Sequence, residues 1–365
     1  MTDAATNGAG DACLTGKSRN GATRSAIALA KRLGLRHVST DALSIRRRRY
    51  GKGWAYIGID GKPIRDARIV RRLGGLAVPP AYEDVLYAPD PAAHLQAVGR
   101  DAAGRLQYRY HPQWDQVREM RKARRLARLA DALPQVRRSV GQYLSADRQT
   151  REFACAAVIE LVARSAIRAG SEGYARLNGT RGAVTLLKSN VTTYGETITL
   201  KFRSKGGKIV TKEFTAPRLA RAIGLLRQLP GGRLFQYQAE DGTARGVAAR
   251  EVNTFLREIA GVNISLKDFR TLLASASVLE ALARMKPAAS ERQRRKQVLE
   301  AVSAAAEDLA NTPTICRKSY VNETVVAAFE DGVLERFSKT LRNCRSPTRR
   351  AKVLAQIIAT ATPGS

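Results

Sequence analysis

The first third of the chain alternates between apolar and polar positions, the pattern of a half-buried strand. Three runs have this pattern, WAYIGI at 54–59, EDVLYAP at 83–89 and GRLQYRYH at 104–111. Glycine, proline and aspartate separate them, as in DGKP at 60–63, and these residue types favour turns. The pattern therefore predicts a small β-rich domain over residues 37–116.

From about residue 117 the apolar positions recur with helical spacing. Leu126, Leu129 and Leu133 lie on one side of a strongly basic segment, which predicts an amphipathic helix. A second helix fits residues 151–170, with Gly170 as its terminating residue. These helices begin a second, larger domain.

A short stretch of strand pattern interrupts the helices. Residues 183–188 (AVTLLK), 197–202 (TITLKF) and 208–214 (KIVTKEF) predict a three-stranded sheet. RSKGG at 203–207 separates the last two runs, so we expect Lys205 at a hairpin tip.

Helices resume near residue 216 and continue toward the end of the sequence. Ser290 and Gln293 have the spacing of a capping box, and Thr312 before a proline has the chemistry of a helix start. The predicted fold class is α+β, with a linker near 112–122 and a mostly α domain at 117–345. Residues 1–36 are expected to be a flexible basic tail, and residues 346–365 a C-terminal tail.

The charge of the chain indicates its partner. Lysine and arginine number 63 against 32 acidic residues, a formal net charge of +31. Such a charge opposes compaction and attracts polyanions, so nucleic acid is the favoured partner and an anionic membrane surface the second. No apolar run approaches the roughly 20 residues of a membrane-spanning helix, so we expect no membrane insertion.

The sequence offers no cofactor site. Four scattered cysteines (Cys13, Cys155, Cys316 and Cys344) and three histidines lack metal-ligand spacing, which favours a reduced, cytoplasmic protein without zinc or disulfides. GKS at 16–18 is no phosphate-binding loop, because Asp11 stands where that loop needs glycine. We therefore expect no metal, no nucleotide and no other cofactor.

Tyr320 is the residue whose role the pattern leaves open. On an ideal helix it lies about 100° round from Val321, off the apolar stripe of Val321, Val325 and Phe329. Such a tyrosine can point at a ligand or simply lie on the surface. A phenol also needs a neighbouring base or a cationic field to act as a nucleophile at neutral pH.

Four segments in the second domain resemble one family in the order in which they occur. They are IRAGSEGYARLNGTRGAVTLLKSNVT, KFRSKGGKIVTKEF, LKDFRT and NTPTICRKSYV. They are similar to the catalytic domain of the type IB DNA topoisomerases, specifically the small poxviral and bacterial group. DAAGRLQYRYH, YGKGWAYIGIDGKPI and GGLAVPPAYEDVLYAPDP resemble the N-terminal half of that group. The resemblance covers roughly residues 37–340 and implies the catalytic fold shared with the tyrosine recombinases.

The resemblance implies a role for each matched position. Tyr320 becomes the nucleophile that links itself to the 3′ end of a cut DNA strand. Arg168, at the close of its helix, and Arg270 match the arginines that hold the scissile phosphate, a task suited to a permanently charged planar fork. Lys205 matches the general acid that protonates the departing 5′ oxygen. Lys201 and Lys208 are so near in the sequence that a shift in the alignment of the motif would assign this role to one of them.

Asn311 departs from the commoner family pattern, in which many members carry histidine. An asparagine amide can donate a hydrogen bond to a phosphate oxygen but cannot shuttle a proton. Asn311 therefore has two interpretations, a catalytic donor or a helix C-cap.

DNA-contacting residues are also implied in the first domain. Gln107, Tyr108 and Tyr110 match a segment that lies in the major groove, although a strand with an aromatic core face explains the two tyrosines as well. Arg105 neighbours this segment. Arg47 and Arg48 belong to the run IRRRRY at 45–50, which fits phosphate contacts or a solvated charged face.

The expected function is DNA relaxation by a monomeric clamp around double-stranded DNA, in the cytoplasm and associated with the nucleoid. Cutting by Tyr320 exchanges one ester for another, so neither ATP nor metal is required. A tyrosine recombinase is the nearest rival, although it usually has His-x-x-Arg where this chain has KDFR at 267–270. A non-catalytic architectural DNA-binding protein is the rival from another class.

Overall fold

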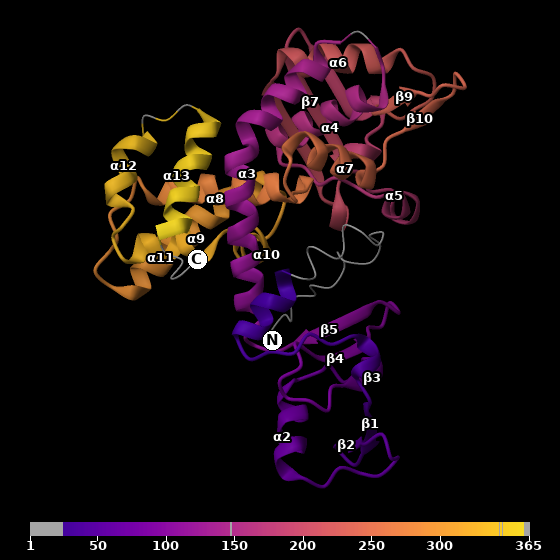
Figure 1. The fold of residues 1–365 in the computed structure, drawn as a ribbon, viewed down its shortest axis with the longest axis vertical. Helices are drawn as coiled ribbons and strands as arrows, with labels where there is room; N and C mark the ends of the chain where they lie inside the picture. The colour runs from indigo at the N-terminus through magenta and orange to yellow at the C-terminus, as the bar shows by residue number, and fades with distance from the viewer. Residues whose placement is uncertain (1–24, 147, 343, 345, 361–365) are drawn as a thin grey trace. The chain divides into compact units, whose positions relative to one another are not determined.

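The structure is a computed structural model that describes residues 25–360 except 147, 343 and 345. Two compact units divide after Arg121, and each is treated separately below (Figure 1). The division falls within helix α3 (Trp114–Leu144) rather than at the predicted boundary of 116/117. The division falls inside the expected linker near 112–122, but most of that segment is helical.

The first unit contains a five-stranded antiparallel sheet in the order β2-β1-β3-β4-β5. Its strands are β1 (Ile45–Tyr50), β2 (Gly53–Ile57), β3 (Glu83–Tyr87), β4 (Leu95–Arg100) and β5 (Leu106–Tyr110). The pattern predicted β2, β3 and β5. It missed β1, whose four consecutive arginines hide the alternation, and β4, which is almost continuously buried.

Helix α2 (Ala67–Gly75) packs on this sheet (Figure 1). Asp66 caps it by accepting hydrogen bonds from the backbone N–H groups of Arg68 and Ile69, which satisfies donors exposed at a helix start. Leu73 enters a core with residues of β1 to β4 that include Tyr87. A short 3₁₀ turn (Thr40–Ala42) precedes β1.

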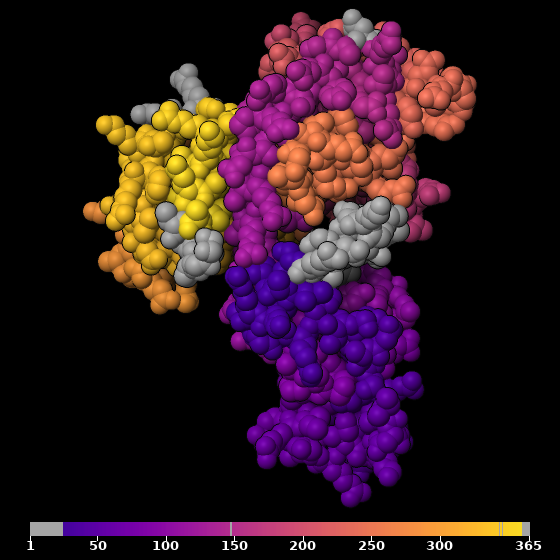
Figure 2. Space-filling model, in the orientation of Figure 1, coloured from indigo at the N-terminus to yellow at the C-terminus, as the bar shows by residue number. Residues whose placement is uncertain are grey.

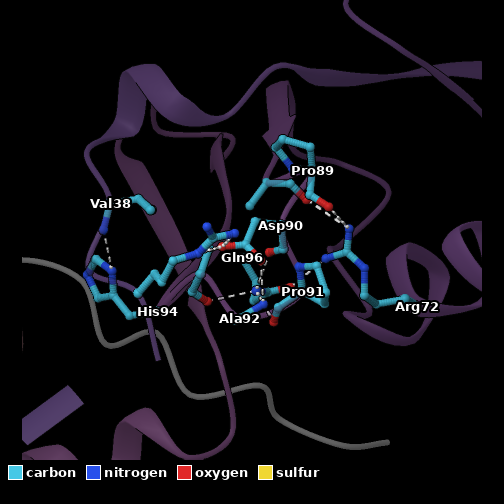
Figure 3. Close-up of polar contacts among 11 residues, drawn as sticks. Val38, Arg72, Pro89, Asp90, Pro91, Ala92, His94 and Gln96 are labelled. Atoms are coloured by element: carbon cyan, nitrogen blue, oxygen red, sulfur yellow. Dashed lines mark hydrogen bonds and ion pairs between the residues drawn. The ribbon is translucent and has the colours of Figure 1, made fainter. Parts of the chain in front are cut away.

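Polar contacts tie α2 to the segment between β3 and β4 (Figure 3). Arg72 donates to the side-chain oxygen of Gln96 at 2.7 Å and to the carbonyl of Ala88 at 2.8 Å. Gln96 donates in turn to the carbonyl of Ala93 at 2.7 Å. The backbone N–H of Val38 donates to Nδ1 of His94 at 3.1 Å, so this buried imidazole accepts a hydrogen bond that its neutral form can receive.

Part of the segment predicted to be an N-terminal tail, residues 25–32, is helical. Leu29 and Ala30 on this helix are buried in a cluster with Trp114 and Val117 of α3. The basic composition that predicted a tail conceals this apolar stripe. Residues 1–24, including Cys13 and the GKS segment, lie outside the described residues.

The second unit is mostly helical. After α3 its helices are α4 (Arg151–Ser165), α5 (Glu172–Asn178), α6 (Pro217–Arg227), α7 (Ala249–Ala260), α8 (Leu266–Leu282), α9 (Glu291–Asp308), α10 (Pro313–Ser319), α11 (Glu323–Glu330), α12 (Glu335–Arg342) and α13 (Pro347–Thr360). They share one large apolar core, in which α4 is buried almost throughout. Among the described residues, no helix has both the length and the apolar content to cross a membrane.

The predicted three-stranded sheet is present, with strand order β6-β7-β8. Its strands are β6 (Val191–Tyr194), β7 (Thr197–Arg203) and β8 (Ile209–Thr215). Residues 183–188 are not its first strand, because they contain a 3₁₀ turn (Ala183–Thr185) and the start of another (Lys188–Asn190). Strands β9 (Gln236–Gln238) and β10 (Ala244–Gly246) form a separate pair. The α+β class is confirmed.

The predicted C-terminal tail is a helix. In α13, Leu354 and Ile357 are fully buried in the main core. Figure 2 shows α13 (yellow) alongside α3 (magenta), and Arg137 of α3 donates to the hydroxyl of Thr348 at 3.4 Å. The two predicted helix starts are confirmed, since Ser290 and Thr312 both accept capping hydrogen bonds from the backbone.

Candidate active site

Tyr320 lies at a break between two helices. α10 ends at Ser319 and α11 begins at Glu323, so the single helix that was expected through Tyr320 is interrupted there. Val321, as expected, is buried, but Tyr320 is also only 9% exposed. The alternative of an ordinary surface tyrosine is therefore wrong.

Arg270 of α8 is packed against this phenol. Its guanidinium carbon lies 4.8 Å from the centre of the Tyr320 ring, and the residue is 3% exposed. It donates to the carbonyl of Ala166 and, at 3.1 Å, to the carbonyl of Leu309. Its Nε is buried without a hydrogen-bond partner. A buried charged donor of this kind is costly to leave unsatisfied, which makes it a candidate for binding an anion.

Arg168 reaches the same place from a loop. α4 ends at Ser165, five residues before the predicted Gly170, and Ala166 closes it with a left-handed φ of 55°. The carbonyl of Arg168 accepts from the backbone N–H of Ala183 at 2.8 Å. This backbone pairing fixes the loop from which the Arg168 side chain extends.

Asn311 meets Arg168 directly. Its side-chain oxygen accepts a hydrogen bond from the Arg168 guanidinium, while its Nδ2 is buried without a partner. The C-cap of α9 is Leu309, and Ala310 follows with a left-handed φ of 50°. The Asn311 backbone N–H returns to the carbonyl of Ala306 at 2.9 Å, the longer hydrogen bond of a Schellman motif. Asn311 therefore lies two residues beyond the C-cap of α9, and its interpretation as a simple C-cap is wrong.

Arg168 and Arg270 line a small hollow of about 210 Å³, a volume that includes space open to solvent. Its lining comprises residues from the ends of α4 and α9, from α8 and from the β7–β8 hairpin: Ala166, Ile167, Arg168, Phe202, Ser204, Val210, Arg270, Asp308, Leu309 and Ala310. Tyr320 contacts Arg270 and Asn311 contacts Arg168, but neither is part of the lining. The two donors without a partner are Nε of Arg270, which lines the hollow, and Nδ2 of Asn311, whose side-chain oxygen accepts from Arg168. Two arginines and two spare donors are suited to a phosphate group.

The electrostatics of the site lower the pKa of the Tyr320 phenol. Burial raises the pKa of Tyr320, but the charges of Arg270 and Arg168, hydrogen bonding to Arg270 and the charge of Lys267 outweigh it, so the pKa falls below its ordinary value of 10. Burial lowers the pKa of Arg270 below its ordinary value, an effect partly offset by the neighbouring phenol. The phenol therefore lies in the cationic field that an attacking tyrosine requires.

Lys205 is at the predicted hairpin tip, in a 3₁₀ turn (Lys205–Gly207) between β7 and β8. Gly206 and Gly207 both have positive φ, near 78° and 77°, which glycine adopts without strain. The Lys205 Nζ lies 5.7 Å from the centre of the Tyr174 ring of α5. Its neighbour Ser204 lines the hollow, but Lys205 itself does not.

The predicted DNA-contacting residues of β5 fall into two groups. Tyr108 and Tyr110 stack with ring centres 6.1 Å apart, and both are half-buried, which leaves a core role and a DNA contact open. Gln107 is buried and donates to the carboxylate of Asp101 at 2.9 Å. Arg105 forms an ion pair with that carboxylate at 2.8 Å. A base contact by Gln107 would require this network to open.

Arg47 and Arg48 project to opposite faces of β1. Arg47 donates to the carbonyls of Val78, Pro79 and Tyr82 at 2.7–3.0 Å and lies 4.0 Å from the centre of the Trp54 ring. These contacts give Arg47 a structural role and contradict the alternative of a solvated charged face at this position. Arg48 is exposed and stays a candidate for a DNA phosphate contact.

Comparison with known proteins identifies the family. A family model of the eukaryotic DNA topoisomerase I catalytic core matches residues 111–346, more than half of the chain. The chain belongs to the type IB DNA topoisomerases. A second model, the N-terminal domain of bacterial DNA topoisomerase IB, matches residues 53–101. DNA topoisomerase 1B of Acanthamoeba polyphaga mimivirus is 28% identical over 294 residues, which cover 79% of this chain and 88% of that protein.

Membership confirms the resemblance and makes the chain an isomerase that acts on DNA. The recombinase and the architectural protein are thereby set aside. Lys267 is a site residue that the motifs do not mark, because KDFR at 267–270 differs from the His-x-x-Arg of recombinases at this position. Its spacing of three residues from Arg270 places it on the same side of α8, and this periodicity could have marked it as a contributor to the field at Tyr320.

Proposed function

We propose that this type IB topoisomerase relaxes supercoiled DNA by reversible cutting of one strand with Tyr320. The observation that supports this best is a buried phenol against Arg270, with its pKa lowered by surrounding cations, beside a hollow with spare hydrogen-bond donors. In the proposed step, the Tyr320 oxygen attacks the phosphorus, and the bond from phosphorus to the 5′ oxygen breaks. A 3′-phosphotyrosine ester results.

The neighbouring residues have distinct proposed roles. Arg168 and Arg270 bind the non-bridging oxygens, and their charge stabilises the transition state. Asn311 adds a neutral donor through Nδ2. Lys205 gives its proton to the leaving 5′ oxygen and must leave the Tyr174 ring to do so.

The resealing step reverses the first. The 5′ hydroxyl attacks the phosphotyrosine, Lys205 recovers its proton, and Tyr320 leaves as phenolate. One ester replaces another in both directions, so we propose that neither ATP nor a metal ion is required. Between the two steps, the DNA end that carries the free 5′ hydroxyl rotates about the intact strand, which changes the linking number of the DNA.

We further propose a monomer that closes around double-stranded DNA, in the cytoplasm and associated with the nucleoid. The net charge of +31 supports attraction to the duplex. Arg48, Tyr108 and Tyr110 are the proposed contacts of the first unit; Gln107 and Arg105 join them only if the Asp101 network opens.

The test uses negatively supercoiled plasmid in EDTA without ATP, with wild type and Tyr320→Phe side by side. We expect relaxation by the wild type and none by the variant, because phenylalanine lacks the attacking oxygen. A duplex labelled on its 3′-phosphate side should become covalently attached to the wild type alone. Relaxation that survives in Tyr320→Phe would place the nucleophile elsewhere.

A further inference from the structure

The main chain around Tyr320 is held by a lysine that is distant in sequence. Lys122 of α3 donates from Nζ to the carbonyl of Lys318 at 3.2 Å and to the carbonyl of Val321 at 2.9 Å. These two carbonyls stand on either side of Tyr320. We infer that Lys122 is a positioning residue that sets the direction in which the phenol points, an inference that rests on the proposed role of Tyr320.

The local sequence explains why an external support is needed. α10 has seven residues, too short to be stable alone, and its C-cap is Tyr320 itself with φ of −129°. The chain here has no glycine to make the left-handed turn that usually satisfies the last carbonyls of a helix. A lysine ammonium near the C-terminal carbonyls replaces that turn, and its charge is favourable at the negative end of the helix.

A second anchor comes from α8. The hydroxyl of Ser275 donates to the carbonyl of Tyr320 at 3.0 Å and accepts from the backbone N–H of Asn322 at 3.1 Å. Ser275 is fully buried, so these hydrogen bonds have no water to replace them. α8 therefore contacts both parts of the nucleophile, the ring through Arg270 and the main chain through Ser275.

Together, Lys122 and Ser275 fix three consecutive stretches of backbone: the end of α10, Tyr320 itself and the residues that lead into α11. In-line attack on phosphorus depends on such fixation, since a displacement of about 1 Å can cost about 100-fold in rate. Neither residue touches the ring oxygen or the hollow in the contacts described above. Their effect is thus expected on the rate of strand cutting and not on DNA affinity.

Lys122→Met tests the inference, because it keeps the aliphatic stem and removes the three donors. We expect its single-turnover rate of covalent-adduct formation to fall by about 10- to 100-fold, with the melting temperature within a few degrees of wild type. The Kd for duplex DNA, measured in a Tyr320→Phe background, should stay within about twofold. Lys122→Arg should recover most of the rate. Lys352→Met, which removes an exposed charge from α13, is the matched control.

Variants of Ser275 provide an independent test of the inference if Lys122→Met folds poorly. Ser275→Ala should slow adduct formation because the Tyr320 carbonyl and the Asn322 N–H are left buried and unpaired, and Ser275→Thr should restore it. A wild-type rate in Lys122→Met, or a loss of rate matched by an equal loss of affinity, would overturn the inference. Failure of the wild type to form any adduct would instead overturn the proposed function, so the two failures are distinguishable.

Discussion

Arg270 organises the site as well as charging it. Its guanidinium donates hydrogen bonds to the carbonyls of Ala166 and Leu309, which are the C-caps of α4 and α9. Two residues beyond each cap stand Arg168 and Asn311, whose side chains meet. One buried guanidinium therefore fixes the starts of both loops that carry the other proposed phosphate ligands.

Asn311 is expected to matter for rate, through its unpaired Nδ2 and its hydrogen bond to Arg168. Asn311→Ala removes both, and we expect a loss of about 100- to 1,000-fold in the cutting rate, the cost of removing one preorganised donor from a developing oxyanion. Asn311→His retains a donor and should lose less. Single-turnover cutting of a labelled duplex measures all three proteins. Equal rates would leave Asn311 without a catalytic role.

Lys267 is expected to tune the nucleophile. Its positive charge is one of those that lower the pKa of Tyr320, so Lys267→Met should raise that pKa and shift the rise of the cutting rate to higher pH. Ultraviolet difference titration of each protein against its Tyr320→Phe counterpart isolates this phenol from the other tyrosines. Lys286→Met, beyond the other end of α8, should leave the titration unchanged. An unshifted Tyr320 titration in Lys267→Met would contradict the prediction.

At the scale of the elements, the loop after α4 crosses the backbone at Gly182, and this crossing determines where Arg168 lies. A Cβ on Gly182 would come within 2.6 Å of the Arg168 carbonyl and of Gly170, and a Cβ on Gly170 would meet Gly182 at 3.0 Å. The φ of Gly182 is −153°, which any residue can adopt, so the requirement for glycine there is one of space. The loop after α4 is thus positioned by contact between backbones.

Gly182→Ala should displace this crossing. We expect a loss of about 1–3 kcal/mol in the free energy of unfolding, with a larger relative loss of cutting rate because Arg168 moves away from Asn311. Chemical denaturation and single-turnover kinetics give the two quantities. Gly224→Ala on α6, where a Cβ has open space, is the control and should be neutral or slightly stabilising. Wild-type behaviour of Gly182→Ala would show that the crossing relaxes without consequence.

Elements with clear periodicity or clear cap residues could be predicted from the sequence, and this includes the hairpin that carries Lys205. β1 could not, because Arg47 occupies an inward position and is satisfied by carbonyls that are 31–35 residues away in the chain. The break at Tyr320 was also hidden, because its support comes from Lys122 and Ser275 in other helices. Prediction from the local sequence pattern fails at these two places because residues distant in the chain satisfy the polar groups.

At the scale of the whole molecule, titratable imidazoles are confined to one unit. The three histidines of the sequence, His37, His94 and His111, all precede residue 121, as do both tryptophans, Trp54 and Trp114. Burial lowers the pKa of each histidine, and that of His94 falls from 6.5 to about 4. The first unit thus contains both an acid-sensitive group and an optical reporter that the second unit lacks.

The first unit should lose stability as the pH falls. The unfolded chain takes up protons on histidine near pH 6.5, whereas the folded His94 resists them until about 4. Stability is therefore complete above pH 6.5 and declines toward pH 4, by about 3 kcal/mol for this residue. Tryptophan fluorescence in urea at pH 7 and pH 5 measures it. His94→Gln should weaken the pH dependence, and an unaltered dependence would refute the assignment.

α13 has a consequence for when the enzyme can first act. Its buried face packs with α8, which contacts Tyr320, and with α11, which follows it, so these helices remain incompletely covered until residues 347–358 are in place. In a chain that is still being synthesised, or one that has been cut by a protease before α13, Lys122 and Ser275 are present but the faces of α8 and α11 that α13 covers are exposed. We expect such a fragment to retain basic surface for DNA but to hold Tyr320 less firmly than the full chain does.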